Sequence, residues 1–100
     1  MPENEEIVIA ERAWTYHASP TEEIPVPVRF TLPRVCKGPG VWECRFSIFW
    51  PDGNVIQRRG VGLDSLEALI NALEIFKVEC SKLKASIGDK ISFDSSDLLS

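Results

Sequence analysis

The sequence predicts an α+β fold: a four-stranded antiparallel meander with one long C-terminal helix packed across one face. Three observations lead to this prediction. One long stretch has helical periodicity, four stretches before it have the composition or alternation of β-strands, and the segments between them are short enough for hairpins. The chain has 100 residues, of which 44% are hydrophobic and 26% are charged. These values are typical of a single domain over residues 1–100, with its core at about 7–84.

We expect the first strand at Ile7–His17, after a weakly ordered acidic lead-in, because this stretch is rich in β-branched and aromatic residues. Polar residues occur on both of its faces, which predicts a bulge or register change near Glu11–Arg12. The second strand, Ile24–Leu32, alternates clearly between apolar and other residues. Because Pro25 and Pro27 supply no backbone donors, its first half should lie at an edge or pair on one side only.

The third strand, Val41–Trp50, follows a connecting loop at residues 34–40 and has the strongest strand pattern in the chain. Large aromatic side chains on one of its faces should dominate the core together with the helix. This face contains Trp42, Cys44, Phe46, Ile48 and Trp50.

A turn at residues 51–54 leads into the fourth strand, Asn54–Gly62. A bulge at Gly53 would change the register of this strand, so the sequence leaves open whether Arg58 or Arg59 faces outward. Near its end, Gly60 and Gly62 would let the chain pass close beneath the start of the helix.

The helix is predicted at Asp64–Lys84, with Asp64 as the N-cap and Gly88 as the stop. We expect the Glu67 carboxylate to reach back to the backbone amide of the cap residue. After the helix, Ile91–Phe93 is a candidate short strand, followed by a weakly held tail. The apolar stripe expected to face the sheet contains Leu66, Leu69, Leu73, Phe76 and Cys80, with Ala68 and Ala72 for close backbone approach.

Two features are candidate interaction surfaces. Ile75 and Val78 interrupt the polar side of the helix, either as two isolated exposed residues or as a contact patch for a second subunit or a partner. The sheet face away from the helix carries charged residues. They form either a solvated lattice of cross-strand ion pairs or a surface for an acidic protein or a nucleic acid, with Arg29, Arg45 and Arg58 as candidate contacts.

Several functional classes are disfavoured. The dense carboxylates lie in predicted loops, and neither a G-x-S-x-G motif nor a phosphate loop is present, so we predict no enzymatic activity. His17 is the single histidine, and Cys36, Cys44 and Cys80 have no C-x-x-C spacing, which argues against a metal, a cofactor or a disulfide framework. We expect Cys44 and Cys80 to be small buried hydrophobes.

Charge and hydropathy bear on the partners. The net charge of −4 disfavours a nonspecific grip on nucleic acid, although it leaves a local basic patch open. The chain has no apolar run near 18 residues, and its acidic N-terminus is unlike a signal peptide. We therefore predict a cytoplasmic protein that has no role in the membrane and binds a protein partner or associates with itself.

Two resemblances accompany these predictions. Over residues 7–84 the chain resembles a family of small bacterial β4α domains of unknown function, through Ile9-Ala10-Glu11-Arg12, Trp42-x-Cys44-x-Phe46 and Gly60-x-Gly62-x-Asp64-Ser65-Leu66-Glu67-Ala68-Leu69. This implies a fold and a bacterial cytoplasmic origin, but no mechanism. Over residues 46–76 the chain is similar to the βββα antitoxins that neutralise small RNA-cleaving toxins, through Phe49-Trp50-Pro51-Asp52 and Gly62-x-Asp64-Ser65-x-Glu67-Ala68-Leu69-x-Asn71-Ala72.

The sequence thus predicts an uncharacterised, non-enzymatic protein-interaction domain. An antitoxin- or immunity-like protein that neutralises a toxin is one alternative. A nucleic-acid or small-ligand binder that uses the arginine-bearing sheet face is the other.

Overall fold

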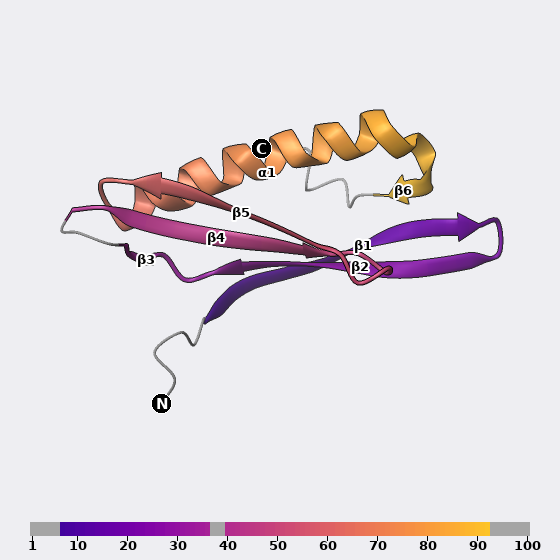
Figure 1. Cartoon of the computed structure of the whole chain (residues 1–100), viewed down its shortest axis with the longest axis horizontal. Coiled ribbons are helices and arrows are strands. Elements are labelled where there is room, and N and C mark those ends of the chain that lie inside the picture. The colour runs from indigo at the N-terminus through magenta and orange to yellow at the C-terminus, as the bar shows by residue number, and fades with distance from the viewer. Residues whose placement is uncertain (1–6, 37–39, 93–100) are drawn as a thin grey trace.

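The computed structural model describes residues 7–36 and 40–92, and it has the predicted α+β architecture (Figure 1). One antiparallel sheet carries a single long helix on one of its faces. The described elements, in chain order, are β1 (Val8–Ser19), β2 (Glu22–Thr31), β3 (Arg34–Val35), β4 (Trp42–Phe49), β5 (Val55–Gly62), α1 (Ser65–Ile87), the 3₁₀ turn η1 (Gly88–Lys90) and β6 (Ile91–Ser92).

The four long strands form the predicted meander, but the described sheet has six strands rather than four. In chain order β2, β4 and β5 each pair antiparallel with the long strand before them. The two additional strands have two residues each. β3 lies within the predicted loop and pairs with β4 beyond the point where Pro33, which has no backbone donor, separates it from β2.

β6 confirms the first two residues of the predicted C-terminal strand, because it pairs with β1 at Thr15 and Tyr16. Phe93, the acidic lead-in at residues 1–6 and the predicted tail at 94–100 lie outside the described residues.

β2 pairs as its prolines predict. Its first half, with Pro25 and Pro27, pairs with β1 only, and β2 meets β4 only at residues 28–30. The bulge or register change predicted near Glu11–Arg12 lies slightly earlier, between Val8 and Ala10, and a second register shift occurs between His17 and Ser19. Arg12 is half-buried on the helix-side face of β1. A long side chain of this kind covers apolar surface with its stem and keeps its charged head at the margin, so it needs no register change.

The pairing of β5 decides the question that the sequence left open. Arg58 is the partner of Phe46, so it lies on the helix side of the sheet, whereas Arg59 is the partner of Arg45 and lies on the opposite side. The close approach expected at Gly60 is confirmed. A Cβ atom added to Gly60 would lie 2.1 Å from the backbone nitrogen of Ala72.

The ends of α1 agree with the capping residues in the sequence. Asp64 is the N-cap, and its Oδ1 accepts a hydrogen bond from the Glu67 amide at 2.7 Å. The Glu67 carboxylate accepts from the amide of Leu63, one residue earlier than predicted, at 2.7 Å. Gly88 ends the helix with a φ of 57°, and its amide donates to the carbonyl of Lys84. The helix thus continues three residues past the predicted end.

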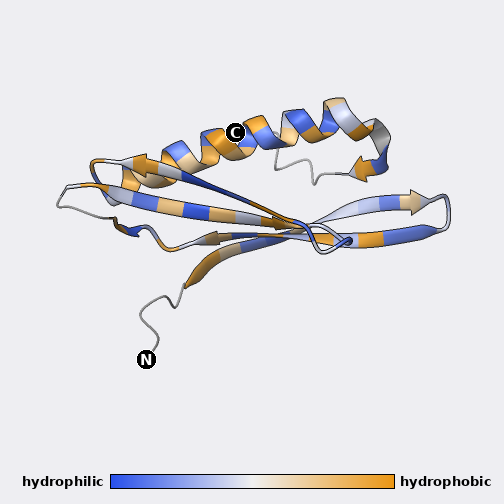
Figure 2. Cartoon of the chain, viewed as in Figure 1, coloured by the Kyte–Doolittle hydropathy of each residue, from blue (hydrophilic) through white to orange (hydrophobic). Residues whose placement is uncertain are grey.

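The side of α1 that faces the sheet differs from the predicted leucine stripe. Ala68, Ala72, Phe76 and Cys80 are buried, whereas 63% of Leu66 and 41% of Leu73 remain exposed. The reason is the pairing of small residues: glycines on β5 and alanines on α1 let the two backbones approach closely, which turns the leucines to one flank. Figure 2 shows hydrophobic and hydrophilic residues interleaved around the helix and along the strands.

An aromatic cluster joins the two layers. The rings of Trp14 and Phe76 stack with centroids 5.5 Å apart, and Phe76 meets Phe46 edge to face at 5.6 Å. The predicted packing of α1 over the aromatic face of β4 is therefore confirmed. Cys44 and Cys80 are buried as predicted, and all three cysteines are thiols rather than disulfides.

Candidate functional site

On the sheet face away from α1, one carboxylate binds three arginines. Glu43, whose side chain is only 4% exposed, lies 3.2 Å from Arg34 Nε, 3.0 Å from Arg45 Nη2 and 2.8 Å from Arg59 Nη1. Neighbouring strands supply these groups, because Arg34 is the register partner of Glu43, and Arg59 is the partner of Arg45. Arg45 and Glu43 are two residues apart on β4 and so share a face. We call these four residues, together with Cys36, the Glu43 cluster.

The cluster carries a net positive charge. Burial alone would raise the pKa of Glu43, but hydrogen bonds from Arg59, Cys36 and Arg34 and the charge of Arg45 outweigh this and lower the pKa to about 2. Glu43 is therefore ionised at neutral pH, and three guanidinium groups face one carboxylate. Burial and the neighbouring carboxylate raise the pKa of the Cys36 thiol. Cys36 consequently stays protonated, a poor state for a nucleophile.

The Glu43 cluster lines a hollow of about 720 Å³. Its remaining lining is aliphatic and comes from Val35, Val41 and Val61. Guanidinium groups offer planar arrays of donors to carboxylates and phosphates, so the hollow has the chemistry of an oxyanion site with apolar walls.

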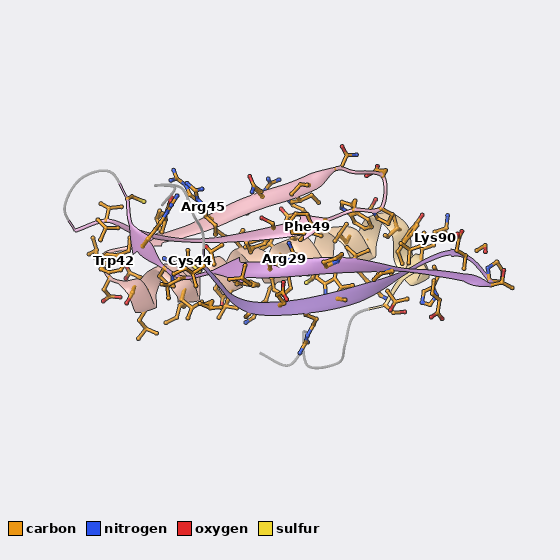
Figure 3. All side chains as sticks on the ribbon, turned by 90° about the horizontal axis from the view of Figure 1, so that it is seen from below. Arg29, Trp42, Cys44, Arg45, Phe49 and Lys90 are labelled. Atoms are coloured by element: carbon orange, nitrogen blue, oxygen red, sulfur yellow. The ribbon has the colours of Figure 1, made fainter. Side chains whose placement is uncertain are left out.

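The three arginines predicted from sequence do not form one surface. Arg29 and Arg45 lie on the face of the sheet that is turned away from α1, which is seen from below in Figure 3 with the helix behind the strands. Arg29 Nε is 2.7 Å from Glu11 Oε1, and its guanidinium group lies 4.9 Å from the ring centroid of Phe49. The placement of Arg58 on this face is wrong, because Arg58 lies on the helix side and its Nε is 3.2 Å from Glu79 Oε1.

Sequence reasoning missed the role of Arg34 altogether. It placed Arg34 in a loop, because Pro33 conceals the short strand that follows. Glu43, Arg45 and one of the β5 arginines were visible as charges on one face of the sheet, which was the available signal. Only the pairing of β3 with β4 brings Arg34 to the same carboxylate.

The two residues of the predicted helix patch, Ile75 and Val78, lie in different surroundings. Ile75 is half-buried and packs against the core, so its expected place on the polar side of the helix is wrong. Ile75 follows the buried Ala68 by seven residues, or about two turns, and therefore shares its side of the helix. Val78 is 53% exposed, as predicted. It lies in a shallow hollow whose lining includes Glu74, Lys77 and Lys82.

A second hollow lies between one flank of α1 and the sheet. Among the described residues, α1 packs mainly on β4 and β5 rather than on β1 and β2. The resulting apolar groove has a volume of about 410 Å³. Its apolar walls are Ile9, Ala10, Val28 and Phe30 from the sheet and Leu69, Leu73 and Phe76 from the helix, with Glu11, Arg12 and Lys77 as the polar lining. Leu69 and Leu73 of the predicted stripe thus form part of one wall of this apolar groove, whereas Phe76 and Cys80 are buried in the core as predicted.

Other chemistry-bearing residues hold elements together. His17 Nε2 lies 2.8 Å from the hydroxyl of Ser92, which links β1 to β6. Within residues 7–36 and 40–92, no three His, Cys, Asp or Glu side chains are grouped so that they could hold a metal ion. In the same part of the chain, no helix combines the length and the apolar character needed to cross a membrane.

Comparison with known proteins identifies a family but no characterised relative. The family model DUF6968, described as a domain of unknown function, matches residues 10–98. Neither a curated protein nor a solved structure matches the chain. The match agrees with the expected domain of unknown function, whereas the bacterial origin and the similarity to antitoxins stay predictions.

Proposed function

The chain belongs to the DUF6968 family, and we propose that this member is a non-enzymatic protein-interaction domain that binds its partner in the apolar groove. The observation that carries the proposal is a row of exposed apolar side chains, Leu66, Ile70 and Leu73, whose last member, Leu73, lines the apolar groove. Isolated exposed leucines are ordinary on protein surfaces, but a contiguous set that continues into a groove is typical of a binding surface.

The exposed surface of this row is large enough to matter energetically. Complete burial of a leucine or isoleucine side chain stabilises a folded protein or a complex by about 1.5–3 kcal/mol. Leu66, Ile70 and Leu73 retain roughly half of their surface in solvent. A partner that covered all three would therefore gain about 2–5 kcal/mol from them, before the contribution of the groove itself.

The lining favours a protein partner over a small substrate. A substrate pocket combines apolar walls with a few convergent polar groups that orient the ligand. The apolar groove is lined mainly by aliphatic and aromatic side chains, with Arg12 and Lys77 as charged neighbours, while the Glu11 carboxylate pairs with Arg29. An apolar centre with charged neighbours is also the arrangement of a protein interface.

The test compares two substitutions on α1. Leu73→Asp places a charge in the apolar groove, and Val78→Asp places one at a similarly exposed position outside it. We expect Leu73→Asp to abolish self-association in light scattering, or capture of a partner by the immobilised chain, while Val78→Asp leaves both unchanged. Circular dichroism and the melting temperature serve as folding controls. Loss of association in Val78→Asp alone, or in neither variant, would refute the apolar groove as the contact surface.

We propose the cytoplasm as the location, because the three cysteines are thiols and reducing compartments keep them so. An antitoxin- or immunity-like role is the narrower form of the same proposal, with the toxin as the protein that occupies the apolar groove. In that case the purified toxin would bind the native chain and fail to bind Leu73→Asp.

A further inference from the structure

We propose that the Glu43 cluster forms a second binding site, which takes the carboxylate groups of an acidic peptide segment. The site lies on the face of the sheet opposite the helix, so it is separate from the apolar groove and does not depend on the function proposed for it. It also differs from the predicted arginine face, because Arg58 is absent from it and Arg34 and Arg59 complete it.

The first argument is charge. Arg34 and Arg59 both bind the same carboxylate, with nitrogen–oxygen distances of 3.2 Å and 2.8 Å to Glu43. These two guanidinium groups therefore share one ionised carboxylate, in a chain whose net charge is −4. The repulsion between the two neighbouring cations disfavours this arrangement, and a bound anion would relieve it.

The second argument is preorganisation. Glu43 engages Nε of Arg34 and Nη1 of Arg59, and a guanidinium group has five N–H donors in a fixed plane. Arg59 is 60% exposed and Arg34 is 39% exposed, so part of each guanidinium group remains accessible from the hollow. The buried carboxylate fixes the arginines in position before a ligand arrives, which reduces the entropy that binding must overcome.

The third argument is the shape and lining of the hollow. Val35, Val41 and Val61 are partly exposed and form aliphatic walls beside the arginines. A ligand that fits both chemistries carries carboxylates on an aliphatic chain, as an acidic peptide with valine or leucine does. Among the residues that the structure describes, the lining contains no aromatic side chain on which a nucleic-acid base would stack. Three arginines also provide few of the phosphate contacts that give affinity for nucleic acid.

The experiment is a titration of the full chain, followed by NMR, with a short blocked peptide of alternating glutamate and valine. The corresponding glutamine–valine peptide is the control ligand. We expect saturable binding of the glutamate peptide and shifts centred on the amides of Val35, Glu43 and Val61. We also expect Arg59→Gln to weaken the Kd about tenfold, the usual effect of losing one charge-assisted hydrogen bond.

Arg58→Gln is the matched control, because it removes the same charge from the adjacent residue on the opposite face. It should leave the Kd within about twofold. Should Arg59→Gln fail to fold, Arg59→Lys keeps the charge but removes the planar group, and we expect a smaller loss of affinity. Leu73→Asp should bind the peptide normally, which separates this test from that of the apolar groove.

Three results would each overturn the proposal: no binding of the glutamate peptide, equal binding of the glutamine peptide, or equal losses in Arg58→Gln and Arg59→Gln. A single-stranded RNA that bound in place of the peptide, with the same dependence on Arg59, would show that the site takes phosphates of a nucleic acid and would also refute it.

Discussion

Replacing Gly60 by alanine tests the closest contact between the two layers of the fold. Gly60 lies on β5 directly beneath α1, and an added Cβ would meet three backbone atoms of Ala68 and Ala72 at 2.1–2.6 Å. Real Cβ contacts are essentially never shorter than 3.0 Å. Because all three atoms belong to the helix backbone, no side-chain rotation can relieve the clash. The helix must therefore move away from β5 by about 1 Å.

The size of the effect follows from that displacement. A gap of 0.5–1 Å forfeits about a quarter to a half of the dispersion attraction across an interface. Here the interface includes Phe76, which connects α1 to the aromatic cluster. We expect Gly60→Ala to lower the free energy of unfolding by about 3–5 kcal/mol, more than ordinary overpacking, because the clash is with backbone. The melting temperature should fall by roughly 15 °C or more.

The assay is urea unfolding followed by tryptophan fluorescence, with buried Trp14 as a reporter of the core. Gly53→Ala is the matched control. Gly53 has a φ of 93°, but an added Cβ there would meet nothing within 4 Å, so its cost is backbone strain of about 1–2 kcal/mol. A loss in Gly60→Ala no larger than that in Gly53→Ala would refute the close packing of α1 on β5.

Two further predictions concern single carboxylates. The pKa of Glu43 falls from its usual 4.5 to about 2, so its contribution to stability is complete above about pH 4.5 and is lost as the pH falls toward 2. Urea unfolding at stepped pH should show that the free energy of unfolding decreases by about 3 kcal/mol over that window. This decrease should be absent in Glu43→Gln. Asp64→Ala removes the side-chain bond at the start of α1 and should lower the free energy of unfolding by about 1 kcal/mol; an unchanged thermal melt would contradict its role as the cap.

Local sequence determined the elements of this protein. The ends of α1 were predictable because a capping carboxylate and a glycine act on backbone groups within one turn of themselves. The one-sided pairing of the first half of β2 was predictable because proline lacks a backbone donor wherever it is placed. The aromatic face of β4 followed from alternation alone.

The orientation of α1 depended on contacts between residues far apart in the chain. A hydrophobic pattern ranks Leu66 and Leu73 above Ala68 and Ala72, and it therefore directs the leucines to the sheet. The structure does the reverse, because glycines on β5 leave room for the alanines and for no larger side chain. This orientation of α1 also leaves Leu66 and Leu73 exposed, turns Ile75 toward the core and forms one wall of the apolar groove.

The Glu43 cluster also required the tertiary structure. The charges were visible in the sequence, but their grouping depends on strand register, and a shift of one residue transfers a side chain to the other face. The register of β5 assigned Arg59 rather than Arg58 to Glu43, and the two-residue strand β3 added Arg34. The sequence by itself thus determined which residues form the helix and the four long strands, since those preferences act within a few residues. Only the tertiary structure decided which side chains meet, because backbone fit and register between distant strands govern those contacts.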